Sequence, residues 1–463
     1  MNRYDTQLRE EEWKNISAYK NDFHATVRLN VLDLKDAKDD VLEVCGRVLR
    51  KRRFAGVVFA DIFESGCTVQ ITCMKSKDPA AYKYVSRYIN AGDYIGVCGR
   101  AGLTKSGNET IYASEVSLLT RAMNPLPDKY LGVQNSQTLK QARYLDIIGD
   151  EEEYKIYIRR SRIIQLFREY LLDRGFIEMD TPVLSTFPSG SNARQFEAHH
   201  IALGCPVYMQ VTAELNLKQM VLCGYDKVFE FCRCFRNEGG DRLHRQEFLN
   251  LEIYSAYMTV EELKKLVQEM YITAFLEFFP QQGLPEIPTV DVHNALLNEF
   301  GIDICSCTEL SEMKTEMLKR NIITEGELPA ITNINAYINR MLRQVVKQEG
   351  FYYLKSYPAK LHPLSRVRSD DERFADMEYL YYKNFNIAQF CGEETDPVRL
   401  EDGLKYQSEI GWKKQLPDRE FIRAVRTGLP PMCGVGISME RMIMILCGKD
   451  SMYETNFFHL FKA

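Results

Sequence analysis

The chain has 463 residues, 45% of them hydrophobic and 27% charged, and its net charge is −5 at pH 7. Because a single hydrophobic core rarely grows beyond roughly 250–300 residues, this length predicts two or three folded domains. The slightly acidic balance excludes a uniformly basic nucleic-acid binder. It still allows a local basic surface, which residues 47–53 would provide with five arginines and lysines.

The thirteen cysteines predict neither a disulfide framework nor a zinc site, because they are scattered, odd in number and without C-x-x-C spacing. The pairs Cys232/Cys234 and Cys305/Cys307 would place both thiols on one strand face, which is poor geometry for tetrahedral chelation. No apolar run approaches the ~20 residues of a membrane span, and the first twenty residues are charged. We therefore expect a cytoplasmic protein with reduced cysteines and no membrane contact.

The N-terminal part predicts a helical extension and then a small β-barrel. Residues 1–35 are polar and have a helical pattern, whereas residues 36–125 contain short alternating strands separated by glycines. The five predicted strands are residues 44–48, 57–63, 68–73, 94–99 and 110–113. Residues 126–150 contain Leu126-Pro127 and a polar stretch, and are expected to form a linker.

Residues 151–463 predict one large α+β domain, an antiparallel sheet with flanking helices. It begins with a long amphipathic helix over residues 152–173, where apolar side chains recur at helical spacing. Residues 260–345 are largely helical in pattern and are expected to be an insertion.

Two segments far apart in the chain predict a split ATP site. Arg236 and Glu238 stand two residues apart on a predicted strand, so their side chains point to one face. An arginine can grip a phosphate, a carboxylate can accept a hydrogen bond from the adenine amino group, and Phe248 can cover the base. Near the C-terminus, the glycine-rich residues 434–438 allow close approach of backbone to a ligand, and Arg441 offers a second phosphate contact.

These segments resemble motifs 2 and 3 of class II aminoacyl-tRNA synthetases, and residues 175–182 resemble motif 1. The resemblance is closest to lysyl-tRNA synthetases and is carried by residues 142–148, 192–196 with His199-His200, 213–218 and 427–431. It implies an ATP-dependent ligase that uses Mg²⁺, acts on tRNA, and forms a homodimer through the motif 1 segment. It implies Arg236 and Arg441 as the catalytic residues.

The resemblance also implies two sets of contacts in the catalytic domain. The residues at ATP-binding positions are Arg236, Glu238, His244, Phe248, Asn386, Gly436 and Arg441. Those at amino-acid-binding positions are Gly190, Glu214, Glu252, Tyr254, Gln389, Cys391 and Glu393. In this set Glu214 would bind the α-ammonium of the amino acid, and Glu393 with the Tyr254 hydroxyl would bind the ε-ammonium.

The predicted barrel resembles the oligonucleotide-binding (OB) fold that precedes the catalytic domain in lysyl-, aspartyl- and asparaginyl-tRNA synthetases. Residues 46–47, Phe59, Asp61, Gln70 and 92–99 carry this resemblance. It implies an anticodon-binding surface in which Phe59, Gln70 and Glu109 contact tRNA. The alternative is that Phe59 packs inside the barrel.

The chain departs from the family pattern at the magnesium positions. Tyr379 and Asn386 stand where the family has glutamates, so protein ligation of Mg²⁺ would be weakened and the ion would be carried mainly by ATP. Glu378 could replace a ligand only if a bulge turned it to the other face. Cys391 and Gln389 replace a phenylalanine and an asparagine, which allows a substrate that resembles lysine without being lysine.

Three functions therefore remain open. The first is activation of lysine or a lysine-like amino acid as an adenylate and its transfer to tRNA. The second is a ligase that delivers the amino acid to a protein or a small molecule. The third is a synthetase-like binding or regulatory protein without catalysis, which the lost magnesium carboxylates would favour.

Overall fold

The computed structural model describes residues 23–29, 32, 34, 36–37, 40–124, 126, 142–148, 150–188, 193–281, 286–306, 310–330, 334–409 and 419–460. The chain divides into two compact units, residues 1–159 with 456–463, and residues 160–455. Most of the predicted helical extension and most of the predicted linker lie outside the described residues.

The first unit contains a closed barrel with the strand order β1-β2-β3-β5-β4. Its strands are β1 (Val41–Phe54), β2 (Val57–Glu64), β3 (Cys67–Met74), β4 (Tyr94–Leu103) and β5 (Glu109–Thr120). The barrel prediction is confirmed, and each strand is longer than its sequence pattern indicated. Helix α2 (Pro79–Tyr88) was not predicted; it begins at Asp78, whose side chain accepts from the N–H groups of Ala80 and Ala81.

The second unit is built on an eight-stranded sheet with the order β12-β13-β14-β15-β16-β11-β10-β6. The bounds are β6 (Ile177–Glu178), β10 (Lys227–Phe235), β11 (Glu247–Ala256), β12 (Thr289–Asp291), β13 (Phe351–Lys355), β14 (Met377–Tyr382), β15 (Phe385–Gly392) and β16 (Met432–Ser438). Its interior pairs are antiparallel, and the outermost pair at each edge is parallel. A smaller sheet joins β7 (Leu184–Ser185), β9 (Cys205–Met209) and β8 (Glu197–His200). The α+β prediction is confirmed.

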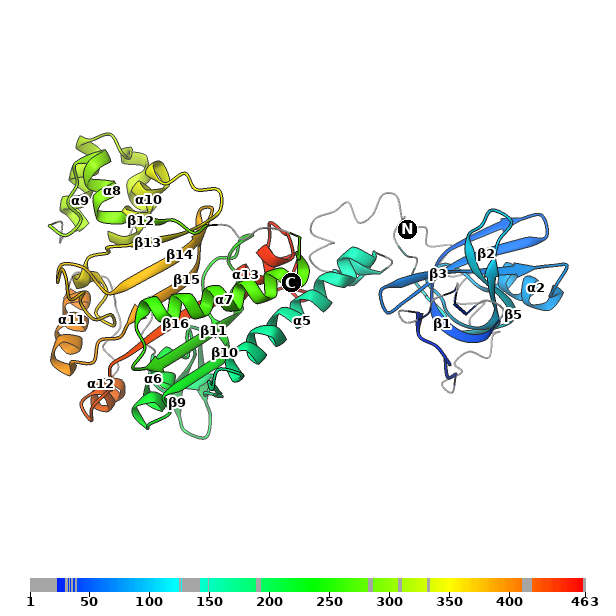
Figure 1. The fold of residues 1–463 in the computed structure, drawn as a ribbon, viewed down its shortest axis with the longest axis horizontal. Coiled ribbons are helices and arrows are strands. Elements are labelled where there is room, and N and C mark those ends of the chain that lie inside the picture. Colours follow the sequence, from blue (N-terminus) through cyan, green and yellow to red (C-terminus); the bar gives the residue numbers. More distant parts are fainter. Residues whose placement is uncertain are drawn as a thin grey trace. The chain divides into compact units, whose positions relative to one another are not determined.

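Helices flank the large sheet. Helix α7 (Val260–Phe278) packs on β15 and β16, and α8 (Val292–Phe300), α9 (Leu310–Lys319) and α10 (Ile334–Val345) group beyond the β12–β13 edge (Figure 1). The other helices within the described residues are α4 (Tyr144–Ile147), α5 (Glu151–Leu172), α6 (Glu214–Leu222), α11 (Pro397–Glu409), α12 (Arg419–Val425) and α13 (Met439–Leu446), with short 3-10 helices η2 (Glu325–Ala330) and η3 (Ala359–Leu361). Among the described residues, no helix is long and apolar enough to cross a membrane.

A buried ion pair joins α5 to α13 within the second unit. The Arg160 guanidinium donates to both carboxylate oxygens of Glu440, at 2.7 and 3.0 Å, and the Leu249 N–H donates to Glu440 at 3.2 Å. The Glu440 side chain is fully buried, and it lies one residue before the predicted catalytic Arg441. A buried carboxylate is tolerated only when it is paired in this way. The pair therefore fixes the start of α13.

Replacing Arg160 by methionine is expected to lower the free energy of unfolding by about 3 kcal/mol, because Glu440 would lose its bidentate partner while remaining buried. Urea unfolding measures this change. Arg159→Met is the matched control, since the neighbouring Arg159 makes only a long contact with the exposed Glu152, at 3.9 Å, and should change stability little. Equal effects of the two substitutions would contradict this role for the pair.

Candidate active site

A cavity of about 680 Å³ opens on one face of the large sheet. Its lining residues on β11 and β16 alternate along each strand, so they share a face, as side chains two residues apart must. On β15 the adjacent Asn386 and Ile387 both line the cavity, next to an irregularity in the β14–β15 register. All described residues predicted to contact nucleotide or amino acid line this cavity: Glu214, Arg236, Glu238, His244, Phe248, Glu252, Tyr254, Asn386, Gln389, Cys391, Glu393, Gly436 and Arg441. Gly190 lies outside the described residues.

Glycines on the middle strand make the base of the cavity. Strand β16 lies between β11 and β15, and two rows of paired residues cross the three strands: Glu252, Gly436 and Gln389, and then Tyr254, Gly434 and Cys391. A Cβ atom on Gly434 would lie 2.2 Å from the Tyr254 ring, and one on Gly436 would lie 2.9 Å from Glu252 Oε2. Side chains from β11 can therefore lie over β16 only because these positions are glycine.

Three charged groups meet at one end of the cavity, two of them buried and the third, Glu214, partly exposed. The Lys218 ammonium lies 2.8 Å from Glu214 Oε1 and 2.5 Å from Glu393 Oε2. The side chains of Lys218 and Glu393 are only 2% and 3% exposed, so both charges are shielded from water. Burial alone would lower the pKa of Lys218, but the two carboxylates raise it above its usual value. Lys218 is therefore a fixed cation that joins the two predicted ammonium-binding carboxylates.

A third carboxylate, Glu252, lies beside this group. Its oxygens accept hydrogen bonds from Thr212 Oγ1 at 2.9 Å, Asn250 Nδ2 at 3.2 Å and the Tyr254 hydroxyl at 3.3 Å. Burial, with a contribution from nearby Glu214, raises the pKa of Glu252 to about 7. Burial likewise raises the pKa of Glu393 to about 7, although Lys218 acts to lower it. Both carboxyl groups therefore titrate near neutral pH, and each would be ionised more fully by an approaching cation.

The other end of the cavity is cationic. The Arg441 guanidinium donates to the backbone carbonyls of Asn386 at 2.6 Å and Leu243 at 3.3 Å, which fixes its position. Burial and the nearby Arg236 lower the pKa of Arg441, because two cations are held close together out of water. Arg236 lies over the Phe248 ring at 4.9 Å, and its Nε atom is buried without a hydrogen-bond partner among the described residues. A bound polyanion would offset the repulsion between the two guanidinium groups and give Arg236 Nε a hydrogen-bond acceptor.

The loop between β10 and β11 closes this end. Asp241 pairs with His244 in an isolated bridge, and Asp241 Oδ1 lies 2.9 Å from His244 Nδ1. Glu238, which is exposed, accepts a hydrogen bond from the Arg194 N–H at 3.3 Å. Arg245 also lines the cavity, and burial lowers its pKa. The loop thus adds a third arginine to the two that the sequence identified.

The magnesium positions hold no carboxylate. Tyr379 and Asn386 both line the cavity, and burial raises the pKa of the Tyr379 phenol, so it stays neutral. Glu378 does not replace them: it pairs with Lys264 of α7 at 3.0 Å, and the irregularity in the β14–β15 register falls after it, between Leu380 and Tyr381. Mg²⁺ prefers carboxylate oxygens, so these side chains do not form a protein-held magnesium site.

Several residues of the site were not identified from sequence. Lys218 had a usable signal, because a Glu–Lys pair four residues apart on a helix places both side chains on one face. Gly434 belongs to the glycine-rich segment, but no ligand contact was predicted for it. Arg245 and Asn250 were single polar residues in or after a loop, and only the fold brings them to the cavity.

The predicted tRNA-contacting residues lie on the barrel of the first unit. Phe59 is half-buried between the fully buried Val58 and Ala60, so it points away from the barrel core, and the interior alternative is wrong. The exposed Phe54 ring lies 6.0 Å from the Phe59 ring in an edge-on arrangement. Gln70 and Glu109 lie near one another, because Thr110, next to Glu109, donates to the Gln70 carbonyl at 3.0 Å.

A mainly antiparallel sheet that carries an arginine-bearing hairpin, a glycine strand and a second arginine at the start of the following helix defines a class II synthetase catalytic unit. The family model for class II tRNA synthetases of the aspartyl, lysyl and asparaginyl group (D, K and N) matches residues 135–461. An OB-fold nucleic acid binding domain matches residues 42–119. The chain belongs to the class II aminoacyl-tRNA synthetases, and it is a ligase of that class.

Curated relatives match nearly the whole chain. A protein named lysine–tRNA ligase from Methanoculleus marisnigri is 32% identical over 446 residues, which are 92% of this chain and 87% of the relative. Proteins of the same name from Listeria innocua and Bacillus subtilis are 30% and 29% identical, over 93% and 96% of this chain and 89% and 90% of their own lengths.

Replacing Lys218 by methionine is expected to destabilise the protein by about 3 kcal/mol at pH 8, because Glu393 would be left buried without its cation. This loss of stability should become smaller toward pH 5.5. The pKa of Glu393 is already raised to about 7, so at pH 5.5 its carboxyl group is protonated in both proteins and needs no cationic partner. Urea unfolding at the two pH values measures this. Lys265→Met, on an exposed position of α7, is the control and should show no such pH dependence. An equal loss at both pH values would contradict the ion pair.

Proposed function

We propose that this enzyme activates lysine, or an amino acid with a similar basic side chain, as an aminoacyl-adenylate and passes it to tRNA. The observation that carries the proposal is the charge of the cavity's anionic end. Among the described residues at this end, Glu214, Glu252 and Glu393 are opposed by the cation Lys218, so these four groups carry two net negative charges when all are ionised. The α- and ε-ammonium groups of lysine would balance them.

A neutral or acidic side chain would leave this buried charge uncompensated, which is the physical basis of selection against it. Glu393 Oε2 is held by Lys218, whereas Oε1 lies over Gly434, within 2.7 Å of the position of a Cβ there. In this proposal Oε1 receives the ε-ammonium. Cys391, beside Gly434 in the sheet, leaves space along the substrate stem for a hydroxylated or β-amino relative of lysine.

The carboxylate of the amino acid would point toward Arg236, where the α-phosphate of ATP would also lie. The amino-acid carboxylate attacks the α-phosphorus in line, and pyrophosphate leaves. Arg236 and Arg441 hold the phosphates, and they need little reorganisation because Arg441 is already fixed by two carbonyl groups. Mg²⁺, bound through the ATP phosphates, would add charge neutralisation on the leaving group.

Transfer to tRNA is supported by the barrel, whose outward Phe59 with Phe54 offers stacking surfaces beside the polar Gln70 and Glu109. We also propose a homodimer through the motif 1 segment. There β6 is the edge strand of the large sheet, and Ile177 on it is 44% exposed. Covering such an edge strand is a common reason for association.

Arg236→Ala is expected to lower lysine-dependent exchange of pyrophosphate into ATP by at least about 10²–10³-fold, because it removes a preorganised phosphate contact. Arg233→Ala is the matched control: it lies on β10, three residues before Arg236, is exposed, and does not line the cavity. Exchange should be measured with lysine, hydroxylysine, β-lysine, ornithine and the standard amino acids. Undiminished exchange in Arg236→Ala would contradict the proposed site. If the unmodified protein binds ATP but shows no exchange with any amino acid, a non-catalytic protein would be favoured.

Lysine binding is expected to weaken about tenfold between pH 8 and pH 6 for each carboxyl that takes part. The free-protein pKa values of Glu252 and Glu393 are raised to about 7, and ammonium groups bind the ionised forms, so protons must leave before lysine binds below pH 7. Titration calorimetry across this range measures it. Glu393→Gln should bind lysine weakly with a shallower pH profile. A flat profile in the unmodified protein would contradict this use of the carboxylates.

A further inference from the structure

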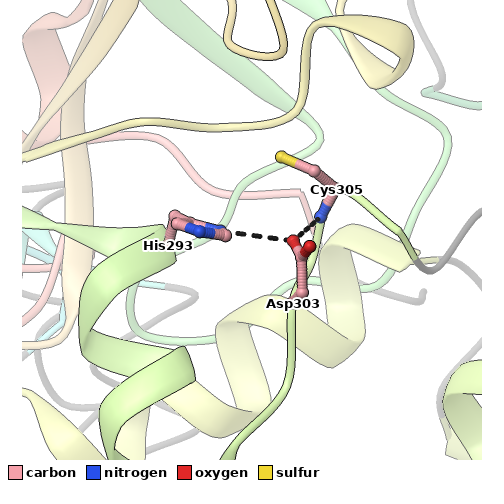
Figure 2. Close-up of side chains that lie close together, drawn as sticks. All are labelled: His293, Asp303 and Cys305. Carbon is pink, nitrogen blue, oxygen red and sulfur yellow. Dashed lines mark hydrogen bonds and ion pairs between the residues drawn. The ribbon is translucent and has the colours of Figure 1, made fainter.

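Three side chains of different chemistry meet in the helical insertion, away from the cavity. His293 lies in the first turn of α8, and Asp303 and Cys305 lie in the loop that follows this helix (Figure 2). One ligand atom from each lies within 4.8 Å of the other two. His293 Nδ1 faces Asp303 Oδ1 at 3.5 Å, and the Cys305 backbone N–H donates to the same oxygen at 2.9 Å.

His293 provides an independent indication of a ligand. Its side chain is only 9% exposed, and Nδ1 is buried without a hydrogen-bond partner among the described residues. Buried ring nitrogens nearly always have a partner, so one without it requires an explanation. The ring is held in place by an edge contact with Phe374, with centroids 5.2 Å apart. The nitrogen is therefore fixed toward Asp303 without completing a hydrogen bond to it.

The donor set selects the kind of ion. Imidazole, thiolate and carboxylate together suit Zn²⁺ and similar first-row divalent ions, whereas Mg²⁺ and Ca²⁺ prefer oxygen ligands alone. Two N/O ligands at zinc distances in a tetrahedron lie roughly 3.3 Å apart, which is close to the 3.5 Å between Nδ1 and Oδ1. The sulfur lies within 4.8 Å of one ligand atom of His293 and one of Asp303, so it would have to move by roughly 1 Å to bind the same ion.

We propose that His293, Asp303 and Cys305 bind one Zn²⁺ ion, with water as the fourth ligand. The loop is already shaped for this: the Asp303 carbonyl accepts from the Ser306 N–H and hydroxyl, which holds Asp303 and Cys305 in one turn. The ion would tie this turn to α8 and so fasten the insertion together. It does not touch the cavity, and its binding is independent of the amino-acid activation proposed above.

Cobalt is the probe that reports the thiolate directly. Full-length protein treated with a chelator is titrated with Co²⁺, and the thiolate-to-cobalt charge-transfer absorption and the visible bands of tetrahedral cobalt are followed. We expect one equivalent to bind and Zn²⁺ to displace it. Cys305→Ser should abolish the charge-transfer band, and His293→Gln and Asp303→Asn should weaken binding at least tenfold. Cys223→Ser, an exposed free thiol elsewhere in the unit, should leave the titration unchanged.

A second measurement covers the case in which a variant folds poorly. Excess Zn²⁺ should raise the melting temperature of the unmodified protein and of Cys223→Ser, and should not raise that of His293→Gln, whose own melting curve without zinc shows whether it is folded. A charge-transfer band that survives in Cys305→Ser overturns the proposal. So does the lack of any band or zinc-dependent stabilisation in the unmodified protein, which would leave a plain His–Asp ion pair beside a thiol.

Discussion

The site depends on one constraint, the register of three neighbouring strands. Strand β16 pairs with β11 and with β15 without a register shift. Residues of the three strands therefore lie side by side in rows, and the rows that line the cavity have a glycine on the middle strand. The Tyr254 ring occupies the space that a side chain at Gly434 would need. A slip of one residue would turn the carboxylates to the α7 face, where Lys264 already pairs with Glu378. The antiparallel sheet therefore sets both the base of the cavity and the placement of its charges.

Given that register, the cavity keeps opposite charges apart along its length. The charge of the carboxylates at one end is partly balanced by Lys218. At the other end, the guanidinium groups of Arg236 and Arg441 repel each other. Neither end is neutral by itself, so a ligand with ammonium groups at one side and phosphates at the other is favoured at both. The Arg160–Glu440 pair contributes by fixing the helix that carries Arg441.

The sequence predicted the barrel and the nucleotide-binding segments from local signals: alternation, glycine runs, and polar residues two apart on strands. The amino-acid-binding residues of the cavity were implied only by the resemblance to lysyl-tRNA synthetases, because nothing local brings Glu214, Glu252 and Glu393 together. The extra length of the barrel strands and helix α2 depend on pairing and capping that alternation does not show. Lys218 was missed although Glu214 precedes it by four residues on α6, because its second partner, Glu393, is far away in the chain. The His293 cluster was missed for a different reason: its spacing matches no short metal motif, and only the turn after α8 brings the three groups together.

At the cationic end of the cavity, Tyr379 and Asn386 stand where the resemblance to lysyl-tRNA synthetases implies two acidic residues. With a neutral phenol at Tyr379 and an amide at Asn386, the described groups around Arg236, Arg245 and Arg441 leave this end more cationic than it would be with two carboxylates. Under the function proposed above, such an end would bind both the triphosphate of ATP and the pyrophosphate product more strongly, because both are polyanions. This difference in side-chain charge arises at Tyr379 and Asn386 and does not involve the position of Arg441, whose guanidinium is anchored through backbone carbonyls.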